Sequence, residues 1–205
     1  LLPEEIHTLD FGIDFLANKN NSLRVNYFHT VTNNLINRRF IIPAGELGNT
    51  MDTPRYGNSD GELFDGVEIE WKGSLKNRFF YYANAAYVKG EDKTENKEVE
   101  FIPNWQASCG LTWKASDKFS VSTYAKYTGK RSGHLLSGEY TETDAFLIWN
   151  MNLKLKISKR LTLKLIGKNL SDTEYFYPEY IRRSIPYIPG GPGRSLFVKV
   201  LYKLH

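Results

Sequence analysis

The chain has 205 residues, with 27 Lys and Arg, 23 Asp and Glu, and a formal net charge of +4. Its mean hydropathy of −0.45 and the lack of a run of ~18–20 apolar residues exclude membrane-spanning helices. Membrane-spanning strands are not excluded, because they need only ~9–11 residues, half of which are polar. The basic residues follow no helical face or nucleic-acid motif, so we expect no nucleic-acid partner. The single cysteine, Cys109, excludes a disulfide framework within the chain.

Alternation of apolar and polar residues predicts about nine strands with no helical periodicity. In chain order they cover residues 7–17, 22–38, 66–72, 78–88, 105–114, 119–128, 144–157, 161–169 and 195–204. The connections alternate in length. Short turns are expected near 18–21, 73–77, 115–118 and 158–160, and long loops near 39–61, 90–104, 129–143 and 170–193. The loop at 90–104 is densely charged, and its carboxylates alternate with lysines, which favours a solvated loop over a metal site.

The hairpin between Asp144 and Asn169 carries the clearest pattern. One face of its first strand is apolar, and the other is polar with two lysines. The apolar set is Leu147, Trp149, Met151, Leu153, Leu155 and Ile157, and the polar set is Asn150, Asn152, Lys154 and Lys156. Successive side chains of a strand point to opposite faces, so this hairpin fits a wall between lipid and water. Alternating short and long connections are typical of outer-membrane barrels, and we therefore predict an all-β, antiparallel, up-and-down transmembrane β-barrel.

Four short motifs then appear in order along the chain. They are Leu2-Pro3-Glu4-Glu5 with Asp10-x-Gly12, Asp65-Gly66-Val67-Glu68, the segment from Lys168 to Tyr175 (K-N-L-S-D-T-E-Y), and Pro192-Gly193-Arg194. Together they resemble the "P-E…E-x-G", "G-x-E", "N-L-x-D-x-x-Y" and "P-G-R" segments of TonB-dependent outer-membrane receptors. The resemblance covers essentially the whole chain. It implies a bacterial outer-membrane location, a barrel of 22 strands and an internal plug.

About nine strands cannot close that barrel, and open edges in hydrocarbon would leave backbone groups unpaired. No signal peptide precedes the first strand, and no plug or coupling segment is visible. We therefore expect residues 1–205 to be the C-terminal portion of a longer receptor barrel. The expected partners are the remaining strands and plug, TonB through the missing N-terminal part, and lipid or lipopolysaccharide.

The resemblance implies a receptor that imports a small ligand: a ferric siderophore or similar iron chelate first, with haem, cobalamin or a glycan as other cargoes. Loop residues able to hold an anionic chelate are the expected contacts. They are Lys130, Arg131, His134, Tyr177, Tyr180, Arg182 and Arg183. Each of them has a plainer interpretation, as an interfacial aromatic, a lipopolysaccharide contact or a solvated loop residue. For His134 we favour a solvated residue over a haem ligand.

Three other classes remain open. A passive porin-like or adhesin-like barrel would need no plug. A soluble β-sandwich would bury the apolar face of residues 147–157 between two sheets. An outer-membrane enzyme would need a nucleophile and base in contact, but the sequence has no Ser-His-Asp arrangement, phosphate loop or metal-ligand cluster. We therefore predict that the protein is not an enzyme and needs no cofactor.

Overall fold

The structure is a computed structural model that describes residues 1–48, 50, 53–135, 138–179 and 187–204, with the backbone alone at 38–41 and 47. The chain divides into two compact units. Unit 1 comprises Leu1–Phe11, Tyr27–Gly66 and Val88–Val99, and unit 2 comprises Gly12–Asn26, Val67–Tyr87 and Glu100–His205. Across the described residues, we find no helix long and apolar enough to span a membrane.

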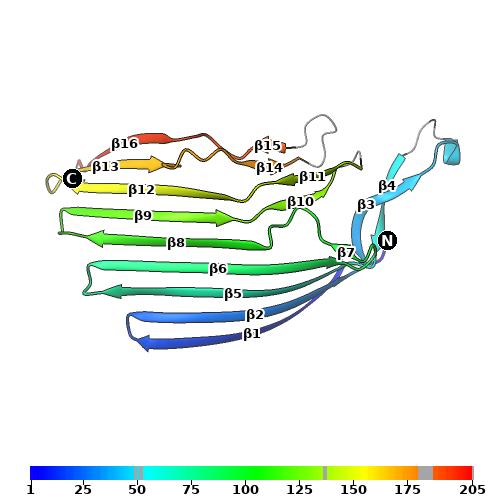
Figure 1. The fold of residues 1–205 in the computed structure, drawn as a ribbon, viewed down its shortest axis with the longest axis horizontal. Helices are drawn as coiled ribbons and strands as arrows, with labels where there is room; N and C mark the ends of the chain where they lie inside the picture. Colours follow the sequence, from blue (N-terminus) through cyan, green and yellow to red (C-terminus); the bar gives the residue numbers. More distant parts are fainter. Residues whose placement is uncertain (49, 51–52, 136–137, 180–186, 205) are drawn as a thin grey trace. The chain divides into compact units, whose positions relative to one another are not determined.

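The long strands follow one another in a single sheet. In order of hydrogen-bonded neighbours they are β1 (Glu5–Asn18), β2 (Asn21–Asn33), β5 (Glu62–Leu75), β6 (Phe79–Asp92), β8 (Trp105–Lys114), β9 (Phe119–Thr128), β12 (Phe146–Lys156), β13 (Leu161–Lys168) and β16 (Ser195–Tyr202). A short strand, β7 (Lys97–Glu98), pairs with β6. Figure 1 shows β8, β9, β12, β13 and β16 side by side, and each pair is antiparallel. The predicted all-β, up-and-down order of about nine long strands is confirmed.

Tight turns occupy the four connections predicted to be short, and their residues explain why. Asn18 Oδ1 accepts the backbone N–H of Asn20 at 2.9 Å. Lys76 and Asn77 have φ angles of 51° and 53°, the left-handed pair that suits a two-residue hairpin. The hydroxyl oxygens of Ser116 and Ser158 accept backbone N–H groups two and three residues ahead. Side-chain acceptors of this kind favour turns over continued strand.

The apolar side chains of β12 share one face and are not covered by a second layer. Leu147 is 49% exposed and Trp149 is 42% exposed. The β12–β13 register places Leu153 opposite Leu165, so the apolar face continues onto the next strand. The only buried large apolar residues in the described part of the chain are Leu135 and Phe146. A soluble sandwich would bury the β12 face, so the exposed face supports the predicted lipid-facing wall.

Aromatic rings lie at both ends of the β6–β8 pair on this apolar face. Phe79 and Trp113 are register partners near the β5–β6 turn, with stacked rings 6.3 Å apart. Tyr87 and Trp105 pair at the opposite end, with rings 4.8 Å apart. Rows of aromatic residues at two levels, with apolar residues between them, are typical of strands that cross a membrane. Cys109 lies between the two rows and is exposed, which suits a small apolar residue of this wall.

The long connections are more regular than predicted, because three of them contain short two-stranded sheets. These are β3 (Leu35–Ile42) with β4 (Thr53–Ser59), β10 (Arg131–His134) with β11 (Tyr140–Thr143), and β14 (Phe176–Pro178) with β15 (Tyr187–Pro189). The strands of the last two of these sheets have only three or four residues, which leave too little alternation to be seen in a sequence. The predicted strand 22–38 is also divided, because Asn34 has a left-handed φ of 54° that ends β2 before β3 begins.

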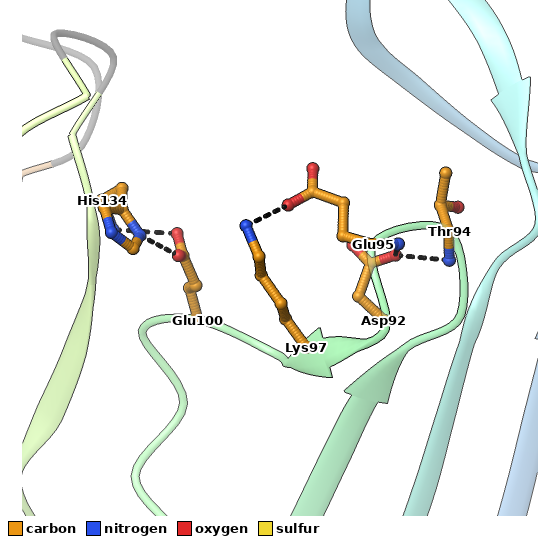
Figure 2. Close-up of polar contacts among 6 residues, drawn as sticks. All are labelled: Asp92, Thr94, Glu95, Lys97, Glu100 and His134. Carbon is orange, nitrogen blue, oxygen red and sulfur yellow. Dashed lines mark hydrogen bonds and ion pairs between the residues drawn. The ribbon is translucent and has the colours of Figure 1, made fainter.

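In unit 1, side chains stabilise the connections that leave the sheet. Asn58 Nδ2 donates to the carbonyl oxygen of Asn34 at 2.6 Å, which ties the β3–β4 hairpin at its base. In the charged β6–β7 connection, Asp92 Oδ1 accepts the N–H of Thr94, and Lys97 lies 3.5 Å from Glu95 (Figure 2). Both side chains of the Lys97–Glu95 pair are at least half exposed, as expected for a solvated loop.

Candidate functional site

Four of the predicted site residues lie in unit 2, in the long connections that contain its two-stranded sheets. Lys130, Arg131 and His134 belong to the connection that contains β10 and β11, and Tyr177 lies on β14. Tyr180, Arg182 and Arg183 lie outside the described residues. The β10–β11 register places Arg131 opposite Thr143 and His134 opposite Tyr140. Because faces alternate along a strand, Arg131 points to one side of this small sheet, and His134 points to the other.

Arg131 and Tyr177 meet although they are far apart in the sequence. The guanidinium carbon of Arg131 lies 5.0 Å from the centre of the Tyr177 ring, within the range of a cation–π contact. Burial lowers the pKa of Arg131 from its usual value. Nη1 of Arg131 is buried and has no hydrogen-bond partner among the described residues, and the same holds for Oγ1 of Thr143 opposite. A half-buried guanidinium with an unused donor suits an anionic or oxygen-rich partner.

The ring of Tyr177 is fixed by two further aromatic residues. Phe146, at the start of β12, lies 4.4 Å from Tyr175 and 6.0 Å from Tyr177 between ring centres. The rings of Tyr175 and Tyr177 meet edge to face at 5.8 Å. Phe146 is only 6% exposed, so this cluster is a small hydrophobic core within the long connections. Tyr175, whose pKa is raised mainly by burial, belongs to this packing.

Lys130 and His134 each have a carboxylate partner. Nζ of Lys130 lies 3.0 Å from Oε2 of Glu142, and this hydrogen bond raises the pKa of Lys130. Figure 2 shows His134 turned towards Glu100, with Nδ1 of His134 2.5 Å from Oε1 and the backbone N–H 2.9 Å from Oε2. These contacts fasten the β10–β11 connection to the segment that precedes β8. His134 is therefore bound to a neighbouring carboxylate, and the plainer interpretation as a freely solvated residue is incomplete.

The "N-L-x-D-x-x-Y" and "P-G-R" motifs close the base of the last long connection. Asn169, which is 4% exposed, accepts the N–H of Thr173 at Oδ1 and donates to the Thr173 carbonyl oxygen from Nδ2. Asp172 Oδ1 accepts the backbone N–H of Arg194 at 2.7 Å. Asn169 and Asp172 have left-handed φ angles of 47° and 55°, which asparagine and aspartate tolerate better than most residues. The motif residues therefore fix where the connection leaves β13 and where it enters β16.

Phe146 and Thr143 belong to this site and were not among the predicted residues. Phe146 falls on the polar face of its strand, where Asn150 and Asn152 follow, and that break in the alternation was the available signal. No feature of the sequence indicates that Thr143 belongs to the site, because its role depends on the pairing with Arg131. The described residues of the site provide a cation, hydroxyl groups and aromatic rings, which suit binding of an anionic ligand with planar groups.

Comparison with known proteins adds to this geometry. Residues 1–170 match the family described as "TonB dependent receptor-like, beta-barrel". The chain is 25% identical, over 98% of its length and 27% of the relative, to the probable TonB-dependent siderophore receptor PiuA of Acinetobacter baumannii. Its fold is similar to those of the copper transporter OprC and of the ferric-catecholate import receptor Fiu from E. coli K12. The TM-scores are 0.73 and 0.76, at 19% identity over 98% of this chain; the match covers 31% of OprC and 28% of Fiu.

The chain therefore spans between about a quarter and a third of the length of these relatives. The family match covers most of the chain, and the exposed apolar wall and alternating connections agree with it. Proteins of this family are transport receptors of the Gram-negative outer membrane, and this chain belongs to the TonB-dependent receptor β-barrel family.

Proposed function

We propose that the protein containing this chain captures an anionic iron chelate at the cell surface and imports it with energy from the TonB system. The observation that carries the proposal is the half-buried guanidinium of Arg131, stacked on Tyr177 with Nη1 unused among the described residues. Hydroxamate, catecholate and carboxylate groups of iron chelates present the oxygen atoms that such a donor binds. The family and its siderophore-receptor relatives support the same cargo class.

The test uses the full-length receptor in cells that lack other receptors for the same chelates. Uptake of radioiron-loaded siderophores is measured for the wild type, Arg131→Ala and Lys159→Ala. Loss of a charge-assisted contact of about 1.5–3 kcal/mol predicts roughly 10- to 150-fold weaker capture for Arg131→Ala. Lys159 is an exposed cation in the turn between β12 and β13, outside the site, so Lys159→Ala is the control with little effect. Equal uptake by all three would remove Arg131 from the binding site.

A strain without TonB separates active import from a passive pore. The proposal requires that uptake stop in that strain, although surface binding continues. Uptake that persists without TonB would favour the porin-like alternative.

We further propose that this chain contributes the C-terminal strands of a larger barrel that surrounds a plug. Among the described strands, β1 and β16 are the two ends of the sheet order, and each would leave a row of backbone groups unpaired in hydrocarbon. The share of its relatives that the chain spans supports the same proposal. The test is the complete reading frame: it should encode about thirteen further strands of a 22-stranded barrel, after a plug. A reading frame too short for them would refute the proposal.

A further inference from the structure

A separate hollow of about 300 Å³ lies beside the aromatic cluster, where β11, the start of β12, β14 and β15 come together. Its lining includes the carboxylates of Glu142, Asp144 and Glu174 and the rings of Tyr175, Phe176 and Tyr187. It is therefore acidic, in a chain whose net charge is +4. The chemistry of the hollow is the reverse of that at Arg131, because it offers negative charge and aromatic faces to a ligand.

Only one of the three carboxylates of the hollow has a partner among the described residues. Glu142 is paired with Lys130 at 3.0 Å. Asp144 and Glu174 have no hydrogen bond or ion pair with any residue that the structure describes. Thr143 also lines the hollow; it is only 4% exposed, and its Oγ1 has no partner among the described residues. Two carboxylates and a buried hydroxyl, none of them with a partner among the described residues, point to a missing cationic group.

The geometry excludes a simple metal site in this part of the chain. Among the described residues, no three His, Cys, Asp or Glu side chains converge closely enough to hold one metal ion. Calcium needs six to eight oxygen ligands at about 2.3–2.6 Å, which carboxylates spread around a hollow do not provide. An organic cation is larger and is recognised differently, by aromatic faces and by carboxylates at its edge. Phe176 and Tyr187, which meet edge to face at 4.9 Å, supply such an aromatic surface.

We propose that this hollow is a binding site for a substituted ammonium group, held by Asp144 and Glu174 against the rings of Phe176 and Tyr187. Thr143 lines the hollow and pairs in register with Arg131, so the hollow lies next to the site of Arg131. A ligand with an anionic chelating part and a protonated amine would use both sites at once. The claim that the imported ligand carries this ammonium group rests on the proposed function. The claim that the hollow binds an ammonium group does not.

Binding is tested on the full-length receptor in detergent, with choline and its uncharged carbon isostere dimethylbutanol as probes, by saturation-transfer NMR. Choline should bind the wild type at least about tenfold more tightly than dimethylbutanol, because only choline carries the charge. The double variant Asp144→Asn/Glu174→Gln should lose about tenfold in choline affinity and keep its affinity for dimethylbutanol. Asp117→Asn, which removes an exposed carboxylate in the β8–β9 turn, is the matched control and should bind choline like the wild type.

Three outcomes would overturn the ammonium site. They are equal binding of the two probes, unchanged choline binding by the double variant, and displacement of choline by calcium at equal concentration, which would make the hollow a metal site.

A second measurement tests whether the imported ligand supplies the ammonium group. Uptake of ferric chelates with and without an amine substituent is compared in the wild type and the double variant. The double variant should lose the preference for amine-bearing chelates and retain uptake of the others. If choline binds as expected but no ferric chelate is imported by the wild type, the proposed function fails and the ammonium site stands. If chelates are imported with no preference for an amine, the assignment to the cargo fails.

Discussion

Replacing Gly190 with alanine should disturb the aromatic cluster through one contact. An alanine Cβ at this position would lie 2.1 Å from Cε2 and 2.3 Å from Cδ2 of Tyr175. Carbon atoms pack at about 3.5–4.0 Å, so the ring must withdraw by roughly 1.5 Å. The Tyr175 ring has little room to do so, because it lies 4.4 Å from the Phe146 ring, and the backbone N–H of Gly190 donates to the Tyr175 carbonyl oxygen at 2.9 Å. Overpacking of this kind costs about 1–3 kcal/mol.

The measurement is urea unfolding of the full-length receptor in lipid vesicles, for Gly190→Ala, Tyr175→Ala and the double variant. Without the Tyr175 ring, the added methyl group meets no obstacle, and Gly190→Ala should then change the free energy of unfolding by less than about 0.5 kcal/mol. The coupling energy of the cycle should therefore be about 1–3 kcal/mol. Gly12→Ala is the matched control, because its Cβ would meet the tip of the Asn26 side chain at 3.2 Å and the Val25 carbonyl oxygen at an ordinary 3.9 Å. If Gly190→Ala lowers the free energy of unfolding by the same amount with and without the Tyr175 ring, the predicted contact is refuted.

Three other predictions concern the motif, the membrane-facing wall and the loop attachment. Asn169→Ala should destabilise the receptor by about 1–3 kcal/mol, because it leaves backbone groups of the last connection unpaired; heat-modifiability on gels measures it. Cys109→Arg should cost about 2–4 kcal/mol in vesicles, whereas Ser108→Arg on the opposite face should cost much less, and similar losses would contradict the lipid-facing assignment. Glu100→Ala should make the connection around His134 more sensitive to limited proteolysis in intact cells, and an unchanged cleavage rate would show that the carboxylate does not hold it.

The sequence was most informative where one rule applied along a whole strand. The alternation of Leu147, Trp149 and Met151 with Asn150 and Asn152 predicted both the strand and the face that is exposed, because side-chain direction in a strand depends only on position. The turns were predictable for a related reason, since Asn and Ser supply their own hydrogen bonds to the backbone.

The candidate site was only partly predictable, because it depends on pairing between distant segments. Arg131 and Tyr177 were both named from their chemistry, but nothing local indicates that Tyr177 lies beneath the guanidinium of Arg131. That contact requires β10 and β11 to pair, and Phe146 to leave the pattern of its strand and pack against Tyr177. Tyr180, Arg182 and Arg183 stay predictions, since they lie outside the described residues.

The contacts between these two long connections also affect ligand recognition. Tyr177 orients Arg131, Tyr175 packs against Tyr177, and the backbone of Gly190 fixes the position of Tyr175. Arg131 comes from the connection between β9 and β12, whereas these three supporting residues come from the connection between β13 and β16. A ligand held by Arg131 is therefore sensitive to a methyl group added at Gly190, through three successive contacts. If Gly190→Ala weakens chelate capture in the wild type but not in the Arg131→Ala background, the two connections act as one binding unit; equal effects in both backgrounds would mean that the aromatic cluster serves stability alone.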